Sequence, residues 1–320
     1  MVTSPSMTTS ELIDYIKSAG AIPASQKTFQ TADLLRLLNT EFMVGLIPSI
    51  LSVHEEYFLY SQEVSIVNGQ STYDIPYRAI GGRLRDLFFK DSTSGRIYKL
   101  SKISIDDIPY FDNANSTGLG VNHYYIQGNQ VVLTTTPSTG ILLFKYFLRP
   151  GELVETTRVG VIASKAIDGS NTVLTLTSAP SVFTSSLQYD FIQDRPGHRT
   201  LKFDVSPVSV NTSANTITFL TSDLPTDLIV NDHVCIAGEA MVPQCPSELH
   251  PILAHRVVQR CMEAQGDQEG LAAASAKVGE LEAKTFNLID NRVEGAATKV
   301  TNFGSTLRQA RRWSRRGFYR

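Results

Sequence analysis

The first part of the chain carries apolar side chains at helical spacing. Thr8 and Glu11 match the capping-box pattern, in which a Thr hydroxyl and a Glu carboxylate bind the free amides of a first helical turn. A second helical pattern begins near Thr31 and places five apolar residues on one face: Leu34, Leu35, Leu38, Phe42 and Leu46. Pro48 lacks an N–H and is expected to kink or restart this helix, whose pattern continues to about Tyr57.

Over residues 59–237 the period changes to that of β-strands. Val, Ile, Thr and aromatic residues alternate with polar ones, and Gly, Pro, Asn or Ser separate the runs. The pairs Asn68-Gly69 and Gly128-Asn129 each stand between two such runs and predict hairpins. Further strands are expected in eight segments: 83–90, 96–103, 141–148, 171–178, 187–194, 200–205, 215–221 and 233–238. The pattern predicts an antiparallel barrel or sandwich.

Helical spacing returns after the segment PQCPSELHP. Ser247 is expected to cap a helix that has Pro251 in its first turn and ends at Gly266. Its apolar face contains Leu249, Ile252, Leu253, Val257 and Cys261. The next helix has a seam at alternating steps of three and four: Leu271, Ala274, Val278, Leu281, Thr285 and Leu288. Because such a seam needs a partner and the connection is short, the two helices are predicted to form a hairpin.

The predicted fold class is α+β, with helices at both ends of the chain and a large antiparallel β insertion between them. Neither helical end can bury its apolar face alone, so the two ends are expected to pack together as one bundle. Two stripes should meet there: Leu34, Leu38 and Phe42 from one end, Leu253, Val257 and Leu281 from the other. The expected regions are N-terminal helices (1–58), a first antiparallel β region (59–159), a second β module (160–240), a helical hairpin (241–295) and a C-terminal arm (296–320).

Charge is distributed unevenly along the chain. The net charge is −2, yet the last twenty residues contain six Arg and no acidic residue, so the rest of the chain is clearly acidic. Five of these arginines are spaced i, i+3, i+4, i+7 and i+8: Arg308, Arg311, Arg312, Arg315 and Arg316. On a helix they would form one stripe of like charges, which repel, so the segment is expected to order only on a partner.

The same segment holds residues that could anchor such a contact. These are Trp313, Phe318, Tyr319 and the final Arg320. Nucleic acid would bind through phosphate contacts and stacking on the rings. An acidic protein surface would bind through bidentate Arg–carboxylate pairs, with the rings as anchors. A third interpretation is a solvated tail with no partner, although arginine and aromatic residues solubilise poorly.

Little in the chain predicts catalysis, a cofactor or a membrane segment. No phosphate-binding loop, nucleophile elbow or HExxH zinc motif occurs, so no enzyme activity and no cofactor are expected. Cys235, Cys245 and Cys261 are interpreted as reduced, buried thiols, because neighbouring histidines do not complete a zinc pattern. The longest apolar run, at 141–148, is too short to span a bilayer, and the N-terminus lacks the pattern of a secretory signal, which predicts synthesis in the cytoplasm.

Several phrases resemble one protein family. The helical segments at both ends, together with "YDIPYRAIGGRLRDLFF", "ELHPILAHRVVQRCMEAQGD" and "LIDNRVEGAATKVTNFGSTLRQARR", are similar to head-to-tail adaptor (connector) proteins of short-tailed bacteriophages. The resemblance implies a structural virion protein at the capsid–tail junction, in a ring of twelve copies between the portal protein and the tail nozzle protein. Genomic DNA would pass through the ring without sequence-specific binding, and residues 302–320 would clasp the portal. Smaller family members lack the β insertion, whose role the resemblance leaves open.

Two alternatives from other classes remain. A nucleic-acid-binding protein would grip DNA with the Arg-rich tail and use the β insertion as an OB-like module, although the strands show no basic stripe. A virion glycan-binding β protein would use Tyr- and Asn-rich strands and loops as a sugar platform, an interpretation that depends on composition alone.

Overall fold

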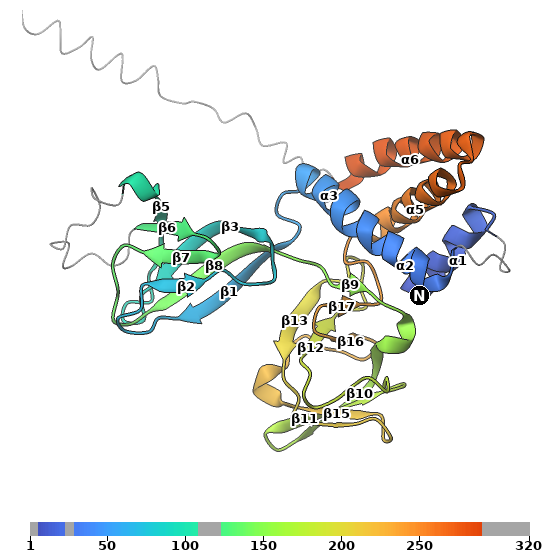
Figure 1. Ribbon diagram of the computed structural model, residues 1–320. Coiled ribbons are helices and arrows are strands. Elements are labelled where there is room, and N and C mark those ends of the chain that lie inside the picture. The colour runs from blue at the N-terminus through green and yellow to red at the C-terminus, as the bar shows by residue number, and fades with distance from the viewer. Residues whose placement is uncertain (1–5, 23–28, 108–122, 290–320) are drawn as a thin grey trace, which may run out of the picture. The chain divides into compact units, whose positions relative to one another are not determined.

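The computed structural model describes residues 6–22, 29–107 and 123–289 (Figure 1). It confirms the α+β class: helices lie near both ends of the described chain, and several antiparallel sheets lie between them. The C-terminal segment with the Arg and aromatic residues lies outside the described residues.

The N-terminal helices follow the sequence pattern closely. Helix α1 (Thr9–Ala19) begins with the predicted capping box, because Thr8 and Glu11 exchange side-chain and backbone hydrogen bonds. Helix α2 (Thr31–Thr40) continues into a π-helical segment, η1 (Glu41–Leu46), and then into α3 (Ile47–Val53). The π turn directly precedes Pro48, so the helix widens there instead of breaking. It ends at Val53, four residues earlier than predicted.

This continuous helix is more apolar than the sequence analysis allowed. Among the described residues, one helix, Thr31–Val53, is long and apolar enough to cross a membrane by length and composition alone. A core helix of a folded protein meets the same criteria, and five of its residues are completely buried in the protein: Leu34, Leu38, Phe42, Leu46 and Ile50. The helix is therefore built into the core of the described chain.

The C-terminal hairpin is present with two corrections. A 3-10 turn, η5 (Ser247–Leu249), precedes α5 (His250–Gln265), so Ser247 is not the helix cap that the pattern predicted. Gly266 ends α5 in the left-handed conformation as expected, and α6 (Gln268–Ile289) packs back on α5. Leu288, predicted for the seam, is 76% exposed, while Phe286 and Ile289 of the same last turn pack against the helical core in its place.

The two ends of the chain share one hydrophobic core. Leu34, Leu38 and Phe42 belong to the same buried cluster as Leu253 and Val257, and Leu281 packs against it, as predicted. The N-terminal segment is also held by its backbone, since Thr9 N–H and Oγ1 both donate to Met241 O. Residues more than two hundred positions apart thus stabilise each other.

Two four-stranded sheets cover the first half of the β insertion. One has the order β1-β8-β3-β4, formed by β1 (Leu59–Ser65), β8 (Ile141–Leu148), β3 (Ala79–Lys90) and β4 (Ile97–Lys99). The other has the order β2-β7-β6-β5, formed by β2 (Thr72–Asp74), β7 (Gln130–Leu133), β6 (His123–Gln127) and β5 (Ser101–Lys102). Both contribute side chains to one core, around Leu87, Val131 and Phe144.

One predicted hairpin is confirmed and the other is wrong. Strands β6 and β7 pair across Gly128-Asn129 with the register that a two-residue turn requires. At Asn68-Gly69 the chain does turn, but β1 pairs with β8 and β2 pairs with β7, so the two strands enter different sheets. The single strand predicted at 96–103 is likewise divided into β4 and β5, which belong to different sheets.

The second half of the insertion is one twisted system of strands. In the described part of the chain seven strands take the order β13-β12-β16-β10-β11-β15-β14. They are β10 (Gly160–Asp168), β11 (Asn171–Leu176), β12 (Tyr189–Ile192), β13 (Thr200–Val205), β14 (Ser209–Asn211), β15 (Thr216–Leu220) and β16 (His233–Ile236). Short β9 (Glu152–Leu153) and β17 (Glu239–Ala240) pair in parallel. Sequence reasoning missed β10, β14 and the β9–β17 pair.

The shared helical core generates a stability prediction. Replacing Leu38 by Ala should lower the free energy of unfolding by about 2–5 kcal/mol, because it leaves a cavity between the two ends of the chain. The same truncation at Val44, 74% exposed on the same continuous helix, should change it by no more than about 0.5 kcal/mol. Urea unfolding of both variants measures the difference. Equal losses would mean that the helix does not join the two ends.

Candidate functional site: a groove along the second helix

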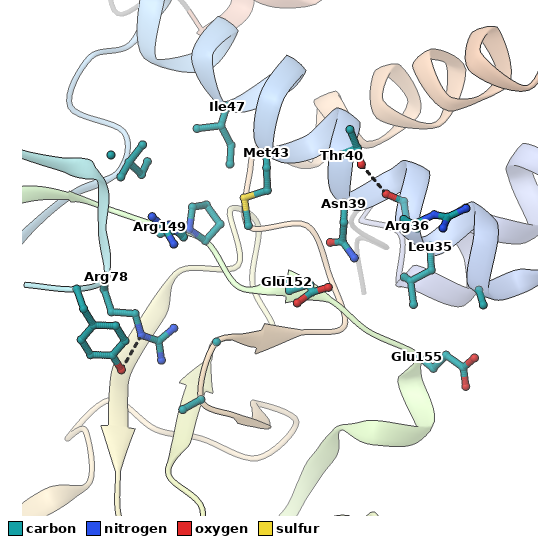
Figure 2. A pocket seen from close by; sticks show the side chains of 17 residues that line it. Leu35, Arg36, Asn39, Thr40, Met43, Ile47, Arg78, Arg149, Glu152 and Glu155 are labelled. Carbon is teal, nitrogen blue, oxygen red and sulfur yellow. Dashed lines mark hydrogen bonds between the residues drawn. The ribbon is translucent and has the colours of Figure 1, made fainter. Parts of the chain in front are cut away.

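A groove of about 990 Å³ runs along the outer side of α2, η1 and α3 (Figure 2). Its opposite wall comes from the start of β3, the link into β9 and the turn before β17. We call it the helix groove. Its lining includes apolar side chains, among them Leu35, Met43, Ile47 and Ile80, and charges of both signs: Arg36, Arg78, Arg149, Glu152 and Glu155.

The wall opposite the helix is fixed by an asparagine. Asn39 Nδ2 donates to Leu153 O at 2.9 Å, and Leu153 N–H donates to Asn39 Oδ1 at 2.7 Å. The Asn side chain therefore binds β9 as a neighbouring strand would. On the other side of β9, Gly151 lies so close to Glu239 that an added Cβ would meet its backbone at 2.9 Å. Glycine is required there by the close approach of β9 and β17.

A buried ion network stands at one end of the helix groove. The guanidinium of Arg78, in the turn before β3, binds both carboxylate oxygens of Asp190 at 3.0 and 2.9 Å and Asp204 at 2.7 Å. Asp190 also accepts hydrogen bonds from the N–H groups of Asp204 and Gly238. The ring of Phe203 lies 5.6 Å from the guanidinium carbon.

The electrostatics of this network follow from its burial. Burial by itself lowers the pKa of Arg78, but the hydrogen bond to Asp204 and the charge of Asp190 raise it above its ordinary value. Arg78 therefore stays charged, and the two carboxylates that bind it come from β12 and the end of β13. Asp204 has a positive φ of 57°, a conformation held by its N–H bond to Asp190. The network fixes where the first β region meets the second.

The hydroxyl groups that line the helix groove belong to Thr40 and Tyr77, and each has a partner within the protein. Thr40 Oγ1 donates to Arg36 O, and Tyr77 Oη accepts from Arg78 Nε. Over the described ranges no group of three or more His, Cys, Asp and Glu residues could hold a metal ion. An apolar lining with charges of both signs is instead the composition of a protein contact surface.

Three histidines form a second buried cluster. His198 stacks on His250 with ring centroids 5.8 Å apart, and His233 lies within reach of His198 and Asp194. Met7 N–H donates to His250 Nδ1 at 2.9 Å, so that nitrogen must be unprotonated, while Nε2 faces Pro243 O at 3.2 Å. Burial lowers the pKa of His233 and of His250 to about 4 each, and lowers that of His198 as well.

The cysteines are free and buried, as the sequence predicted. Burial raises the pKa of Cys261 to about 11 and raises those of Cys235 and Cys245 further above their ordinary range. All three thiols are therefore protonated at neutral pH, and they serve the packing of two cores.

The predicted binding residues belong to a part of the chain that the structure does not describe. Those of the C-terminal segment, from Arg308 to Arg320 with Trp313, Phe318 and Tyr319, lie outside the described residues, and their role stays a prediction. Sequence reasoning missed Arg78, Asp190 and Asp204. The local signal was an arginine directly before the apolar pair Ala79-Ile80. The sequence pattern does not indicate that its partners are Asp190 and Asp204, which follow 112 and 126 residues later.

The helix groove, with its apolar side chains and its charges of both signs, is a surface suited to contact with another protein. The sequence model described as SU10 adaptor protein matches residues 7–190, which is more than half of the chain. The chain therefore belongs to the SU10 adaptor protein family. The match runs from the residue before the α1 cap to Asp190, so it includes Arg78, its first acidic partner and most of the helix groove.

Membership of this family confirms the resemblance to phage head-to-tail adaptors. It implies a non-enzymatic structural role, a place in the virion and contacts with other virion proteins. The comparison with curated proteins gives no match.

The buried ion network generates a second stability prediction. Replacing Asp190 by Asn should lower the free energy of unfolding by about 3–5 kcal/mol, because Arg78 would lose its main counter-charge inside the protein. Arg36→Gln, which removes the exposed pair with Asp33 three residues away, is the matched control and should cost less than about 0.5 kcal/mol. Urea unfolding compares the two. A loss below about 1 kcal/mol for Asp190→Asn would contradict an anchoring role.

The histidine cluster predicts a loss of stability in acid. In the unfolded chain these rings have a pKa near 6.5, whereas His233 and His250 have about 4 when folded, so the unfolded state binds more protons between these values. The contribution of these two neutral rings to the free energy of unfolding is fully present above about pH 6.5 and is lost as pH falls towards 4. For each of the two histidines, the free energy of unfolding should fall by about 2 kcal/mol between pH 7 and pH 5.

Urea unfolding at several pH values tests this expectation. His250→Gln is the control, because a Gln amide can accept from Met7 N–H and donate to Pro243 O without titrating. Its stability should fall less steeply than that of the parent chain between pH 6.5 and 5. Parallel curves for the two proteins would mean that His250 is not a buried neutral ring.

Proposed function

We propose that this protein is a head-to-tail adaptor that forms a ring between the portal and the tail nozzle, around the channel through which the genome passes. The single observation that carries the proposal is the family match over residues 7–190. The ring has twelve copies, and the protein is a structural component of the capsid–tail junction with no enzyme activity and no cofactor.

The proposed architecture assigns a task to each region. The two helical ends form one bundle, and the large antiparallel β insertion, a barrel or sandwich, projects from it. The shared helical core and the three larger sheets support this division. The acidic composition of residues 1–300 supports a channel role, since a negative wall does not retain passing DNA.

The C-terminal arm, 296–320, docks on the portal. Its arginines are proposed to pair with an acidic portal surface: Arg308, Arg311, Arg312, Arg315, Arg316 and Arg320. Trp313, Phe318 and Tyr319 act as anchors. In a ring, one modest contact per copy is multiplied by the number of copies, so weak arms together give firm attachment.

The alternative use of the arm is binding of nucleic acid, which its arginines and aromatic rings also favour. The two uses differ in their targets. Portal docking requires an acidic protein surface, whereas DNA binding is independent of the portal and falls steeply with salt.

Deletion of residues 302–320 tests the arm. The truncated protein should unfold at nearly the same temperature as the full chain, because the shared core ends with α6. It should no longer join the portal when the two are mixed and their complex is weighed by native mass spectrometry. Trp313→Ala alone should weaken docking by on the order of 2 kcal/mol per arm.

The matched control replaces Lys284 by Glu, which reverses an exposed positive charge on α6, outside both the helix groove and the arm. That variant should keep its docking if the arm is the clasp. Undiminished docking of the truncated chain would remove the arm from the portal contact, and salt-sensitive binding of free DNA by the full chain would favour the alternative.

A further inference from the structure

Strand β10 pairs with different strands on its two sides, over most of its length on one side and only at its start on the other. It pairs with β11 from Ile162 to Asp168, but with β16 only at Gly160 and Val161. Beyond this point residues 163–168 are exposed, and no strand in the described ranges pairs with their outer edge. An open edge of this length is a template for another strand.

The register identifies the backbone groups on this edge. The β10–β11 turn has two residues, Gly169 and Ser170, so its closing pair Asp168–Asn171 is hydrogen-bonded within the hairpin. Bonding directions alternate along the strand, and the N–H and C=O groups of Lys165 and Ile167 therefore point away from β11. A β-bulge between Ile162 and Ser164 shifts the alternation by one residue, so Val161 O accepts from Thr177 N–H on the β11 side while Ile162 bonds to Asn231 and Asp232 on the other.

The same group of strands has a second open edge. β14 pairs with β15, and no described strand lies on its other side. Val208, directly before β14, donates to Thr218 O and is 51% exposed, while Ile167 on the β10 edge is 68% exposed. Two large apolar side chains are thus exposed at opposite edges of the four strands β10-β11-β15-β14.

We propose that the β14 edge of one copy adds to the β10 edge of the next, so that a sheet continues from subunit to subunit. The inference rests on the ring of the proposed function. All three pairings among these four strands are antiparallel, so β14 runs opposite to β10. The β14 strand of the next copy therefore continues the antiparallel alternation when that copy is related by rotation alone.

A head-to-tail ring needs two different surfaces on each copy, one for each neighbour. The two edges meet this requirement, whereas pairing of β10 with a second β10 would be two-fold and would stop at a dimer. Pairing also covers both exposed side chains, because Ile167 and Val208 would lie on adjacent strands. On the exposed half of β10 only Lys165 and Asp168 carry charges that oppose association.

A cysteine pair tests the contact directly. The full chain carrying Ile167→Cys and Val208→Cys should form a ladder of covalent multimers on mild oxidation, read by non-reducing electrophoresis. Each single variant is the control and should give no multimer above a dimer, since a ladder needs both edges. The three native cysteines are buried and should add no bands.

A proline variant tests the backbone contact. Ile167→Pro removes the outward N–H and leaves the bonds to β11, so its thermal midpoint should change little while the ring mass is lost in native mass spectrometry. If the Ile167→Pro variant does not fold, the test of the edge contact is the presence or absence of covalent multimers from the cysteine pair.

The outcomes separate the two proposals. A parent chain that forms no oligomer, alone or on the portal, would overturn the ring and this contact with it. The edge contact would be wrong, and the ring would stand, if the protein forms a ring but the cysteine pair gives no ladder of multimers and the Ile167→Pro variant still forms the ring. Covalent dimers from Ile167→Cys alone, with no ladder from the pair, would replace the contact by two-fold pairing of β10.

Discussion

One buried arginine joins the two β regions of the described chain. Arg78 brings a full charge into the protein, and that charge is tolerated only where Asp190 and Asp204 surround it. An ion pair of this kind contributes little net stability compared with an apolar substitute, and we infer that its role here is to select one geometry of the junction. Because its three members come from two β regions, the geometry that it selects is that of their junction.

The parts around the helix groove depend on this junction through a short chain of hydrogen bonds. Arg149 N–H donates to Arg78 O, Gly151 N–H donates to Gln244 Oε1, and Leu153 is held by Asn39 of helix α2. The link 149–153 thereby connects the first sheets, the second sheet and the helical core. A subunit that transmits contacts between two other proteins needs such fixed connections, and the family match includes Arg78, Asn39 and this link.

Local sequence patterns predicted those features of the fold that are determined by interactions within a few residues. The capping box of α1, the glycine end of α5 and the hairpin at Gly128-Asn129 were predictable because each is determined within a few residues. At Asn68-Gly69 the chain turns as expected, but β1 and β2 pair with distant strands and not with each other, since burial on a sheet outweighs the preference of a short turn. The partners of Arg78 and the edges of β10 depend on contacts far apart in sequence, which no spacing reveals.

The central claim is that this chain occupies the junction between capsid and tail. Electron cryomicroscopy of the portal vertex of the intact virion tests it most directly. The account predicts a ring of twelve copies between the portal and the tail nozzle, with the helical core and the sheets of each copy recognisable in the density. A vertex in which portal and nozzle touch without this chain between them would contradict it.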